Sequence, residues 1–336
     1  MNILAADVGG TKTRLLCASA ESPEQILYEA CYKSRDFESF EPLLETFIHD
    51  SGTSASEIET LALALPGLVN ADSARLTNLP WVIDKQSLTD TFGIKNISFI
   101  NDFQASAIGT SQLLEKDQII LNPGIQDPVI LRNNNTRVAV GAGTGLGVSW
   151  AQKGDQDRQL NGHETLRAYD TEGGHIDFAP VDETQIHLLK FLQQRHGHVS
   201  YERILSGDGL VCLYEFFAGK EITDTQKKDI TAEWVNSHTE TDVTADKALS
   251  LFVQIYGAYI GNIALLFKPF GGIFITGGIA AKIVKKMQSD DFINAYLNKG
   301  RMRQLVEQIA VYLVTNERIG VLGAMAEAVR TQQVYK

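Results

Sequence analysis

The stretch NILAADVGGTKTRLLCA, residues 2–18, places two apolar segments on either side of a pair of glycines. Residues 2–6 and 13–18 predict two β-strands, and the residues between them, Asp7-Val8-Gly9-Gly10-Thr11-Lys12, predict the turn of a β-hairpin. We expect the two glycines to adopt positive φ angles, which glycine tolerates better than other residues.

This turn also suits phosphate binding, because glycines without a Cβ let backbone N–H groups approach an anion. The Thr11 hydroxyl would be a further donor, and Asp7 would orient Mg²⁺ through water. The candidate nucleotide contacts here are Asp7, Gly9, Gly10, Thr11 and Lys12. A hairpin turn without a ligand is the open alternative.

The same organisation recurs about 130 residues later. Residues 137–140 predict a strand, GAGTGLG at 141–147 a glycine-rich turn, and residues 148–151 a second strand. Two such hairpins suggest two halves built on one plan, with a cleft between them. The second set of phosphate-binding candidates is Gly141, Gly143, Thr144 and Gly145. An unrelated second hairpin is the alternative, but four glycines in seven residues disfavour a turn without a special backbone requirement.

A third glycine pair, Gly277-Gly278, follows the apolar strand predicted at 272–276 and opens a helix. An anion or a nucleotide base could bind at that helix start. A turn needed only for packing explains the pair equally well.

The buried strand predicted at 97–101 ends in Asn101-Asp102, before a helix expected from near Ala105 to about Leu114. The carboxyl ends of strands face the ligand crevice in α/β sheets, so we interpret Asp102 as the base that accepts a proton from a substrate hydroxyl. Alternatively, Asn101 and Asp102 only cap the helix, since both residue types are favoured N-caps.

Further polar residues are candidates for binding hydroxyl groups. Asn78 lies in the predicted loop 76–81, where Trp81 either walls a site or belongs to the core. Glu172 and His175 flank a glycine pair, so both side chains could face one point. Glu202 lies in the first turn of a helix expected to begin after Ser200, where a carboxylate also suits the helix dipole. A purely structural role remains open for each of them.

Composition limits the classes of function. The 336 residues are 44% hydrophobic and 21% charged, as in ordinary globular proteins, and the net charge of −11 argues against nucleic-acid binding. Three scattered cysteines give no disulfide framework or zinc spacing and suit a reducing cytosol. We expect no signal peptide, because the first residues already form a strand. The most apolar region, residues 257–281, predicts a core helix and a core strand rather than a membrane span.

Six stretches, taken together and in order, resemble the bacterial glucokinases that are separate from the zinc-containing repressor-type sugar kinases. These stretches are residues 7–12, 99–103, 141–147, 172–180, 198–210 and 271–279. The resemblance implies an α/β, actin-like (ribonuclease H-like) ATPase fold with two domains, residues 1–112 plus about 317–336 and residues 113–316. It implies ATP bound between the domains, domain closure over glucose, and transfer of the γ-phosphoryl group to the 6-hydroxyl of glucose.

The resemblance also implies residue roles. Asp102 would be the catalytic base and a sugar ligand, and the other sugar contacts would be Asn101, Glu172, His175 and Glu202. Asp7 to Thr11, Gly141 to Gly145 and Gly277-Gly278 would contact the nucleotide. Mg²⁺ would accompany ATP, and no zinc, nucleic acid or membrane is implied. Family precedent implies a homodimer, and the cysteine pattern together with the expected lack of a signal peptide predicts a cytoplasmic protein.

Two departures and three alternatives accompany this hypothesis. Thr171 stands where a smaller residue often precedes the Glu-Gly-Gly-His run, and the polar loop at 152–171 is longer than expected. The alternatives are a kinase for another hexose, a non-catalytic sugar sensor on the same fold, and an actin-like assembly protein. An assembly protein would share the phosphate hairpins, but it would not need Glu172, His175 and Glu202.

Overall fold

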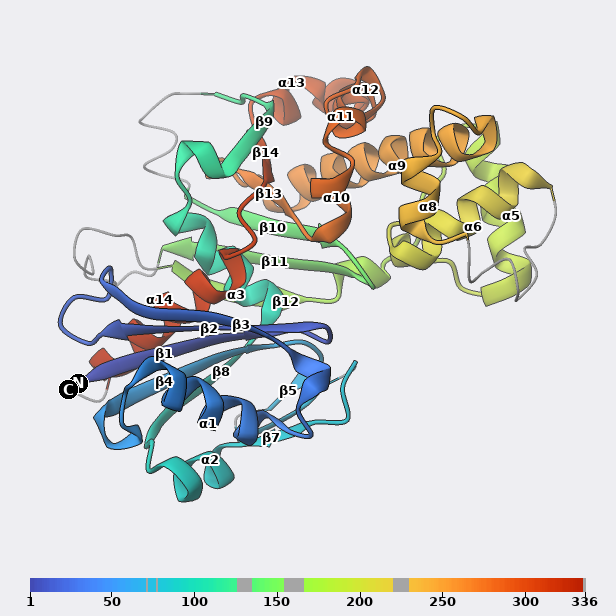
Figure 1. The fold of residues 1–336 in the computed structure, drawn as a ribbon. Coiled ribbons are helices and arrows are strands. Elements are labelled where there is room, and N and C mark those ends of the chain that lie inside the picture. Colours follow the sequence, from blue (N-terminus) through green and yellow to red (C-terminus); the bar gives the residue numbers. More distant parts are fainter. Residues whose placement is uncertain (71, 77, 126–134, 154–165, 220–229, 335–336) are drawn as a thin grey trace. The chain divides into compact units, whose positions relative to one another are not determined.

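The computed structural model describes residues 1–70, 72–76, 78–125, 135–153, 166–219 and 230–334 (Figure 1). The chain divides into two compact units. The first contains Met1–Leu114, Ser149–Asp170 and Asn316–Lys336, and the second contains Glu115–Val148 and Thr171–Thr315.

A five-stranded sheet in the order β3-β2-β1-β4-β8 forms the centre of the first unit. Its strands are β1 (Asn2–Val8), β2 (Lys12–Ser19), β3 (Ile26–Lys33), β4 (Ile58–Leu65) and β8 (Asn96–Asn101). β1, β2 and β3 pair antiparallel, whereas β1, β4 and β8 run parallel. The carboxyl ends of β1 and β8 therefore lie at the same edge of the sheet, and this edge carries Asp7 and Asp102.

Successive side chains of β1 point to opposite faces of this sheet, and both faces are buried. Leu4 and Ala6 belong to one core cluster with the apolar face of α1 (Phe40–Ser51), while Ile3 and Ala5 belong to another with α14 (Ile319–Val334). Figure 1 shows α14 in red beside the blue β1, and α14 contacts β1, β4 and α3. The buried residues of α1, Phe40, Leu43, Leu44 and Phe47, recur at the three- and four-residue steps of one helix face.

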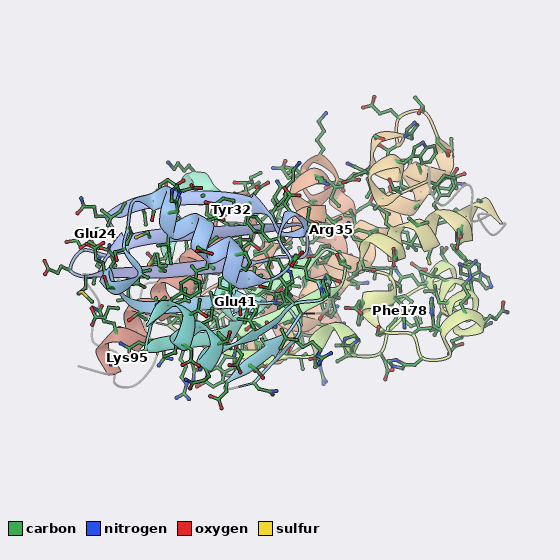
Figure 2. All side chains as sticks on the ribbon, turned by 60° about the horizontal axis from the view of Figure 1, so that its bottom comes forward. Glu24, Tyr32, Arg35, Glu41, Lys95 and Phe178 are labelled. Atoms are coloured by element: carbon green, nitrogen blue, oxygen red, sulfur yellow. The ribbon has the colours of Figure 1, made fainter. Side chains whose placement is uncertain are left out.

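Glu41, which is labelled in Figure 2, lies on α1 and links this helix to α2 (Lys85–Phe92). One of its carboxylate oxygens accepts the Ser39 hydroxyl at 2.7 Å, and the other accepts the hydroxyl of Ser87 on α2 at 3.3 Å. A small sheet completes the unit with β5 (Leu68–Val69), β6 (Ser73–Arg75) and β7 (Val82–Asp84).

The helix after β8 begins earlier than predicted. α3 spans Asp102–Gly109, and a 3-10 turn, Thr110–Gln112, follows it. Asn101 is the N-cap: its side chain accepts the Phe103 N–H at 2.9 Å, and the Gln104 side chain accepts the Asn101 N–H at 3.0 Å. The prediction of a start near Ala105 was wrong because this reciprocal capping closes the helix directly after the strand.

A six-stranded sheet has the order β12-β11-β10-β13-β14-β9. Its strands are β9 (Gln118–Asn122), β10 (Arg137–Ala142), β11 (Leu146–Lys153), β12 (Leu166–Thr171), β13 (Ile273–Thr276) and β14 (Val311–Val314). β10, β13 and β14 run parallel, and β9 pairs antiparallel with β14. The polar loop expected at 152–171 is partly strand, since residues 152–153 end β11 and residues 166–171 form β12; residues 154–165 lie outside the described residues.

Helix α9 (Val243–Phe267) is the longest helix that the structure describes in the second unit. It is long and apolar enough to cross a membrane by length and composition, but 72% of its most apolar window is buried inside the protein. It is therefore a core helix, and β13 follows it as the core strand expected in the same apolar region. The other helices that the structure describes in this unit are α5 (Glu183–His196), α6 (Gly207–Ala218), α8 (Ala232–Ser237), α10 (Gly278–Lys282), α11 (Val284–Met287), α12 (Asp290–Leu297) and α13 (Arg303–Glu307).

The prediction of a helix that begins after Ser200 was wrong. Only a 3-10 turn, Tyr201–Arg203, forms there, and the Ser200 side chain makes no capping hydrogen bond. Helix α6 begins six residues later, because the Ser206 hydroxyl accepts the Gly209 N–H at 3.1 Å. Ser200 and Ser206 are equally good N-caps by residue type, so the sequence alone did not distinguish them.

Candidate active site

The turn between β1 and β2 is the first part of the site. The Gly9 N–H donates to the Lys12 carbonyl at 3.0 Å, and the side chains of Thr11 and Lys12 are exposed. The predicted positive φ angles were wrong, because neither Gly9 nor Gly10 lies in the left-handed region. These glycines serve close packing instead: a Cβ on Gly9 would lie 2.8 Å from the Lys12 carbonyl oxygen, and one on Gly10 would lie 2.7 Å from the Cβ of Asn78.

Ser34 stabilises this turn through two hydrogen bonds, and the sequence did not predict this role. It is completely buried; its hydroxyl donates to the Gly9 carbonyl at 2.7 Å, and its N–H donates to the Thr11 carbonyl at 3.1 Å. A serine directly after β3 carries no local signal of this role, because its partners lie more than 20 residues away.

Asn78 and Trp81, predicted in the same loop, differ in their exposure to solvent. Asn78 is exposed and packs against Gly10, so it lies beside the predicted phosphate turn. Trp81 is only 2% exposed and belongs to the α1 core cluster. Of the two roles considered for Trp81, the core role is therefore the one the structure supports.

Asp102 lies in the first turn of α3, directly after the capping residue Asn101. The Phe103 N–H is shared between the Oδ1 atoms of Asn101 and Asp102, at 2.9 and 3.0 Å. The capping role therefore belongs mainly to Asn101. Burial raises the pKa of Asp102 to about 6, although hydrogen bonds from Phe103 and Asn101 oppose the rise. A half-buried carboxyl with that pKa is mostly ionised at neutral pH and remains able to accept a proton.

Asp7 is the second carboxylate at this edge of the sheet. Burial and the nearby charge of Asp102 raise its pKa to about 7, and Arg14 opposes that rise. Arg14 lies opposite Asp7 in the register of β1 and β2. Its guanidinium, however, forms an ion pair with the Glu29 carboxylate at 2.7 Å. Among the described residues, neither carboxylate forms an ion pair, and two such half-buried carboxylates suit a divalent ion, which prefers oxygen ligands and would stabilise their ionised forms.

The second unit brings together three predicted sugar-binding residues. His175 Nε2 lies 3.6 Å from Glu172 Oε2, and His175 Nδ1 lies 3.8 Å from Glu202 Oε1. The side chains of Glu172 and His175 are 85% and 58% exposed, whereas that of Glu202 is 29% exposed. Glu172 and His175 are thus accessible to a ligand, with Glu202 more deeply placed behind His175.

The glycines between Glu172 and His175 explain how the turn fits. A Cβ on Gly174 would overlap the Leu146 carbonyl oxygen, and one on Gly173 would lie 3.2 Å from Val148 Cβ. The Gly173 carbonyl accepts the hydroxyl of Tyr259 on α9 at 2.8 Å. The backbone of this turn is therefore packed closely against β11. The buried Phe178, labelled in Figure 2, packs edge-on against the ring of Tyr201, with 5.7 Å between the two ring centroids.

The second glycine-rich turn, between β10 and β11, is tied to this region. The Leu146 N–H donates to Glu202 Oε2 at 2.9 Å. The Gly143 carbonyl accepts the N–H of Gly207, the first residue of α6, at 2.9 Å. Thr144 at the tip is exposed and Gly141 is buried. Leu146 and Gly207 were not among the predicted site residues, because only tertiary structure brings them to this turn.

Gly277 and Gly278 differ in their surroundings. Gly277 has a φ of 85°, and a Cβ there would lie 2.6 Å from the Ala142 carbonyl oxygen, so packing alone requires this glycine. Gly278 is exposed and has no atom within 4 Å of the position of a Cβ. The helix that it opens, α10, has only five residues, which gives little helix dipole for binding an anion.

Within the described part of the chain, no group of three or more His, Cys, Asp or Glu residues is placed to hold a metal ion. A surface cavity of about 540 Å³ lies elsewhere in the second unit, near Gln254, Asn294 and Lys299, and it contains none of the predicted site residues.

Comparison with known proteins shows the family to which the chain belongs. The sequence pattern of the family described as glucokinase matches residues 4–331. A glucokinase from Nostoc sp. (strain PCC 7120 / SAG 25.82 / UTEX 2576) is 34% identical, over 98% of this chain and 99% of its own length. The chain belongs to the glucokinase family. This membership makes it an enzyme, a kinase that uses ATP to phosphorylate glucose, the reaction that brings glucose into glycolysis.

Solved structures support the fold of this glucokinase-family chain. A glucokinase from an Antarctic psychrotroph has a TM-score of 0.80 and 27% identity, covering 98% of this chain and 99% of the other. A ROK-family glucokinase from Streptomyces griseus, solved in complex with glucose and AMPPNP, has a TM-score of 0.61 at 17% identity, covering 98% and 100%. The predicted α/β, actin-like fold is confirmed.

Proposed function

We propose that the chain transfers the γ-phosphoryl group of ATP to the 6-hydroxyl of glucose, giving glucose 6-phosphate and ADP, with Asp102 as the general base. The observation that carries this proposal is the position of Asp102, half-buried at the carboxyl end of β8 in the first turn of α3. Its pKa of about 6 keeps it ionised at neutral pH. Its Oδ1 accepts the Phe103 N–H at 3.0 Å, and the proposal assigns the other carboxylate oxygen to the substrate hydroxyl.

Glucose offers hydroxyl groups and no charge, so recognition depends on pairing each hydroxyl with a fixed polar group. Asn78 and Asn101 of the first unit, with Glu172, His175 and Glu202 of the second, form the proposed set. A site of this kind rejects an analogue that lacks one hydroxyl by about 10⁴–10⁵, because a polar group of the protein would then stay unpaired. The close approach of Glu172 and Glu202 to His175 supports grouping these three residues.

The glycine-rich turns are the proposed nucleotide contacts. In the first unit these are Asp7, Gly9, Gly10, Thr11 and Lys12, and in the second Gly141, Gly143, Thr144, Gly145, Gly277 and Gly278. Asp7 would hold Mg²⁺ through water, and its position beside Asp102 with Arg14 bound to Glu29 supports that role. Bound Mg²⁺ would neutralise charge on the phosphate oxygens.

Three further expectations remain proposals. The domains are residues 1–112 with about 317–336 and residues 113–316, the assembly is a homodimer, and the enzyme is cytoplasmic. The proposal includes no zinc site, no nucleic-acid partner and no membrane partner.

The test is a coupled assay of ADP release with purified protein, Mg-ATP and a panel of hexoses. The proposal predicts turnover with glucose, and product analysis should find the phosphate on the 6-hydroxyl. Faster turnover with mannose or fructose would instead assign another hexose. Sugar binding without turnover would indicate a sensor, and ATP-dependent polymerisation without sugar turnover would indicate an assembly protein.

A further inference from the structure

The two carboxylate oxygens of Glu202 face different parts of the second unit. Oε2 accepts the backbone N–H of Leu146 at 2.9 Å, and Oε1 lies 3.8 Å from His175 Nδ1. Leu146 closes the glycine-rich turn, whereas His175 belongs to the proposed sugar site. A single side chain therefore contacts both regions.

Leu146 is held on two sides of its peptide backbone. Its N–H is bound by Glu202, and its carbonyl group lies so close to Gly174 that a Cβ there would be 3.0 Å from the carbonyl carbon. The residue as a whole is only 4% exposed. Since closely packed interiors leave little free space, a shift of Leu146 must also move Glu202 or the Gly173-Gly174 turn.

The other end of the glycine-rich turn is fixed to the segment that carries Glu202. The Gly143 carbonyl accepts the Gly207 N–H at 2.9 Å, and the Gly143 N–H donates to the Gly145 carbonyl at 2.8 Å. Gly207 follows Glu202 by five residues. Both ends of the turn are thus attached to one short segment, residues 202–207.

Building on the proposed function, we propose that Glu202 is a positioning residue that couples glucose binding to the conformation of the glycine-rich turn at 141–147. A sugar hydroxyl bound by this carboxylate would hold Oε2 on the Leu146 N–H, which sets the turn for the phosphates of ATP. Thermodynamic linkage requires that the two ligands strengthen each other by the same factor.

Gly145 allows this coupling to be tested without changing any residue of the proposed sugar site. A Cβ on Gly145 would lie 2.6 Å from Glu202 Oε2, and the φ of Gly145 is not in the left-handed region. An alanine methyl group therefore meets the flexible end of Glu202 rather than backbone, and it displaces the carboxylate from Leu146. Gly207 is the matched control, because it is not a proposed ligand contact and a Cβ there would make only ordinary contacts, 3.7 Å from the Gly143 carbonyl oxygen and 4.0 Å from the Ala232 Cβ.

The experiment is calorimetric titration of the full chain with glucose, with and without AMPPNP and Mg²⁺, and the reciprocal titration with AMPPNP. For the wild type we expect a coupling factor in the range of about 5–150, which is typical of allosteric pairs. Gly145→Ala should weaken glucose binding without nucleotide by about tenfold or more, the effect of losing one hydrogen bond to a charged group, and bring the coupling factor near 1. Gly207→Ala should keep the wild-type glucose affinity to within about twofold, since its methyl group makes only ordinary contacts and the Gly207 N–H still binds the Gly143 carbonyl.

Wild-type glucose affinity and coupling in Gly145→Ala would overturn the inference, as would a wild-type coupling factor of 1. Should Gly145→Ala not fold, Glu202→Gln and Glu202→Ala decide: the glutamine oxygen still accepts the Leu146 N–H and should keep the coupling, whereas alanine should lose it. Equal coupling in these two variants would also reject the inference. Absence of glucose binding in the folded wild type would instead reject the proposed function.

Discussion

The Cα of Gly320 faces the carboxylate of Asp7 so closely that a Cβ on Gly320 would overlap Oδ2 and lie 2.8 Å from Cγ. Gly320 lies in the first turn of α14, and Asp7 lies near the end of β1, more than 300 residues earlier in the sequence. The last helix therefore forms one wall around a carboxylate of the proposed phosphate site.

Gly320→Ala should disturb Asp7 through this contact. Alanine ordinarily stabilises a helix by about 1 kcal/mol relative to glycine, but here its methyl group would overpack a half-buried carboxylate. We expect a net destabilisation of about 1–3 kcal/mol and a higher KM for Mg-ATP. Urea unfolding and steady-state kinetics measure these two effects.

Gly323→Ala separates the two effects. A Cβ on Gly323 would overlap the Ala105 carbonyl and lie 2.9 Å from the Gly109 backbone nitrogen, so α14 and α3 would have to separate. This variant should be destabilised while its folded fraction keeps the wild-type KM for Mg-ATP. An equal rise of KM in both variants would show that Asp7 is not specifically involved.

Asp102→Asn tests the base directly. The amide cannot accept the hydroxyl proton, so kcat should fall by about 10² or more while glucose binding stays measurable. Gln104→Ala is the control, since Gln104 belongs to the same capping arrangement and to no proposed contact with substrate. It should lose about 1 kcal/mol of stability or less and retain kcat. Near-normal kcat in Asp102→Asn would reject the assignment of the base.

The pH profile should reflect the same carboxyl. Because the pKa of Asp102 is raised to about 6, protonation below that pH removes the base, and kcat/KM should fall as pH decreases through about 6. Rates measured from pH 5 to 8 under glucose-limiting conditions provide the test. A profile that stays flat down to pH 5 would contradict the assignment.

Asp7 should make metal-free stability depend on pH in the unusual direction for an aspartate. Its pKa is about 7 in the folded state against an ordinary 3.8, so the folded state holds a proton that the unfolded state releases. Its contribution to stability is therefore present below about pH 4 and is lost as pH rises through about 7. Asp7→Asn should be more stable than the wild type at pH 8, by about 1–3 kcal/mol, and equally stable near pH 4. Chemical unfolding of the metal-free protein at both values measures the difference, and a constant offset between them would refute the cause.

Glu172→Gln should weaken glucose binding more than ATP binding, because its exposed carboxylate faces His175 in the proposed sugar site. Asp177→Asn is the control: Asp177 is also exposed, follows in the same segment, and pairs with His198 at 2.7 Å. Calorimetry with each ligand should find glucose affinity lowered only in Glu172→Gln. Equal losses for glucose and ATP would place Glu172 outside the sugar site.

Much of the fold could be predicted from local patterns. β1, β10 and α9 are long, strongly apolar and bounded by glycine or proline, so their periodicity identifies them. Boundaries failed where two candidate caps compete, as Ser200 and Ser206 do, or where reciprocal capping between Asn101 and Gln104 starts a helix early.

The sequence could predict which candidate residues lie close together along the chain. It could not predict the long-range hydrogen bonds that hold the turns of the candidate site. The pairing of Glu172 with His175 follows from a short turn in the sequence. The bond from Leu146 to Glu202 spans 56 residues, and Ser34 reaches Gly9 across 25 residues. Such contacts depend on tertiary packing, which local propensity does not encode.

The placement of α14 against β1 has a consequence for protein synthesis. Ile3 and Ala5 share a core with Val321 and Met325, so one face of the first sheet stays uncovered until nearly the whole chain has left the ribosome. At about 5–20 residues per second, that interval is on the order of 15–60 s, during which an apolar surface is available to chaperones. The earliest residues to be translated are thus among the last to reach their native surroundings.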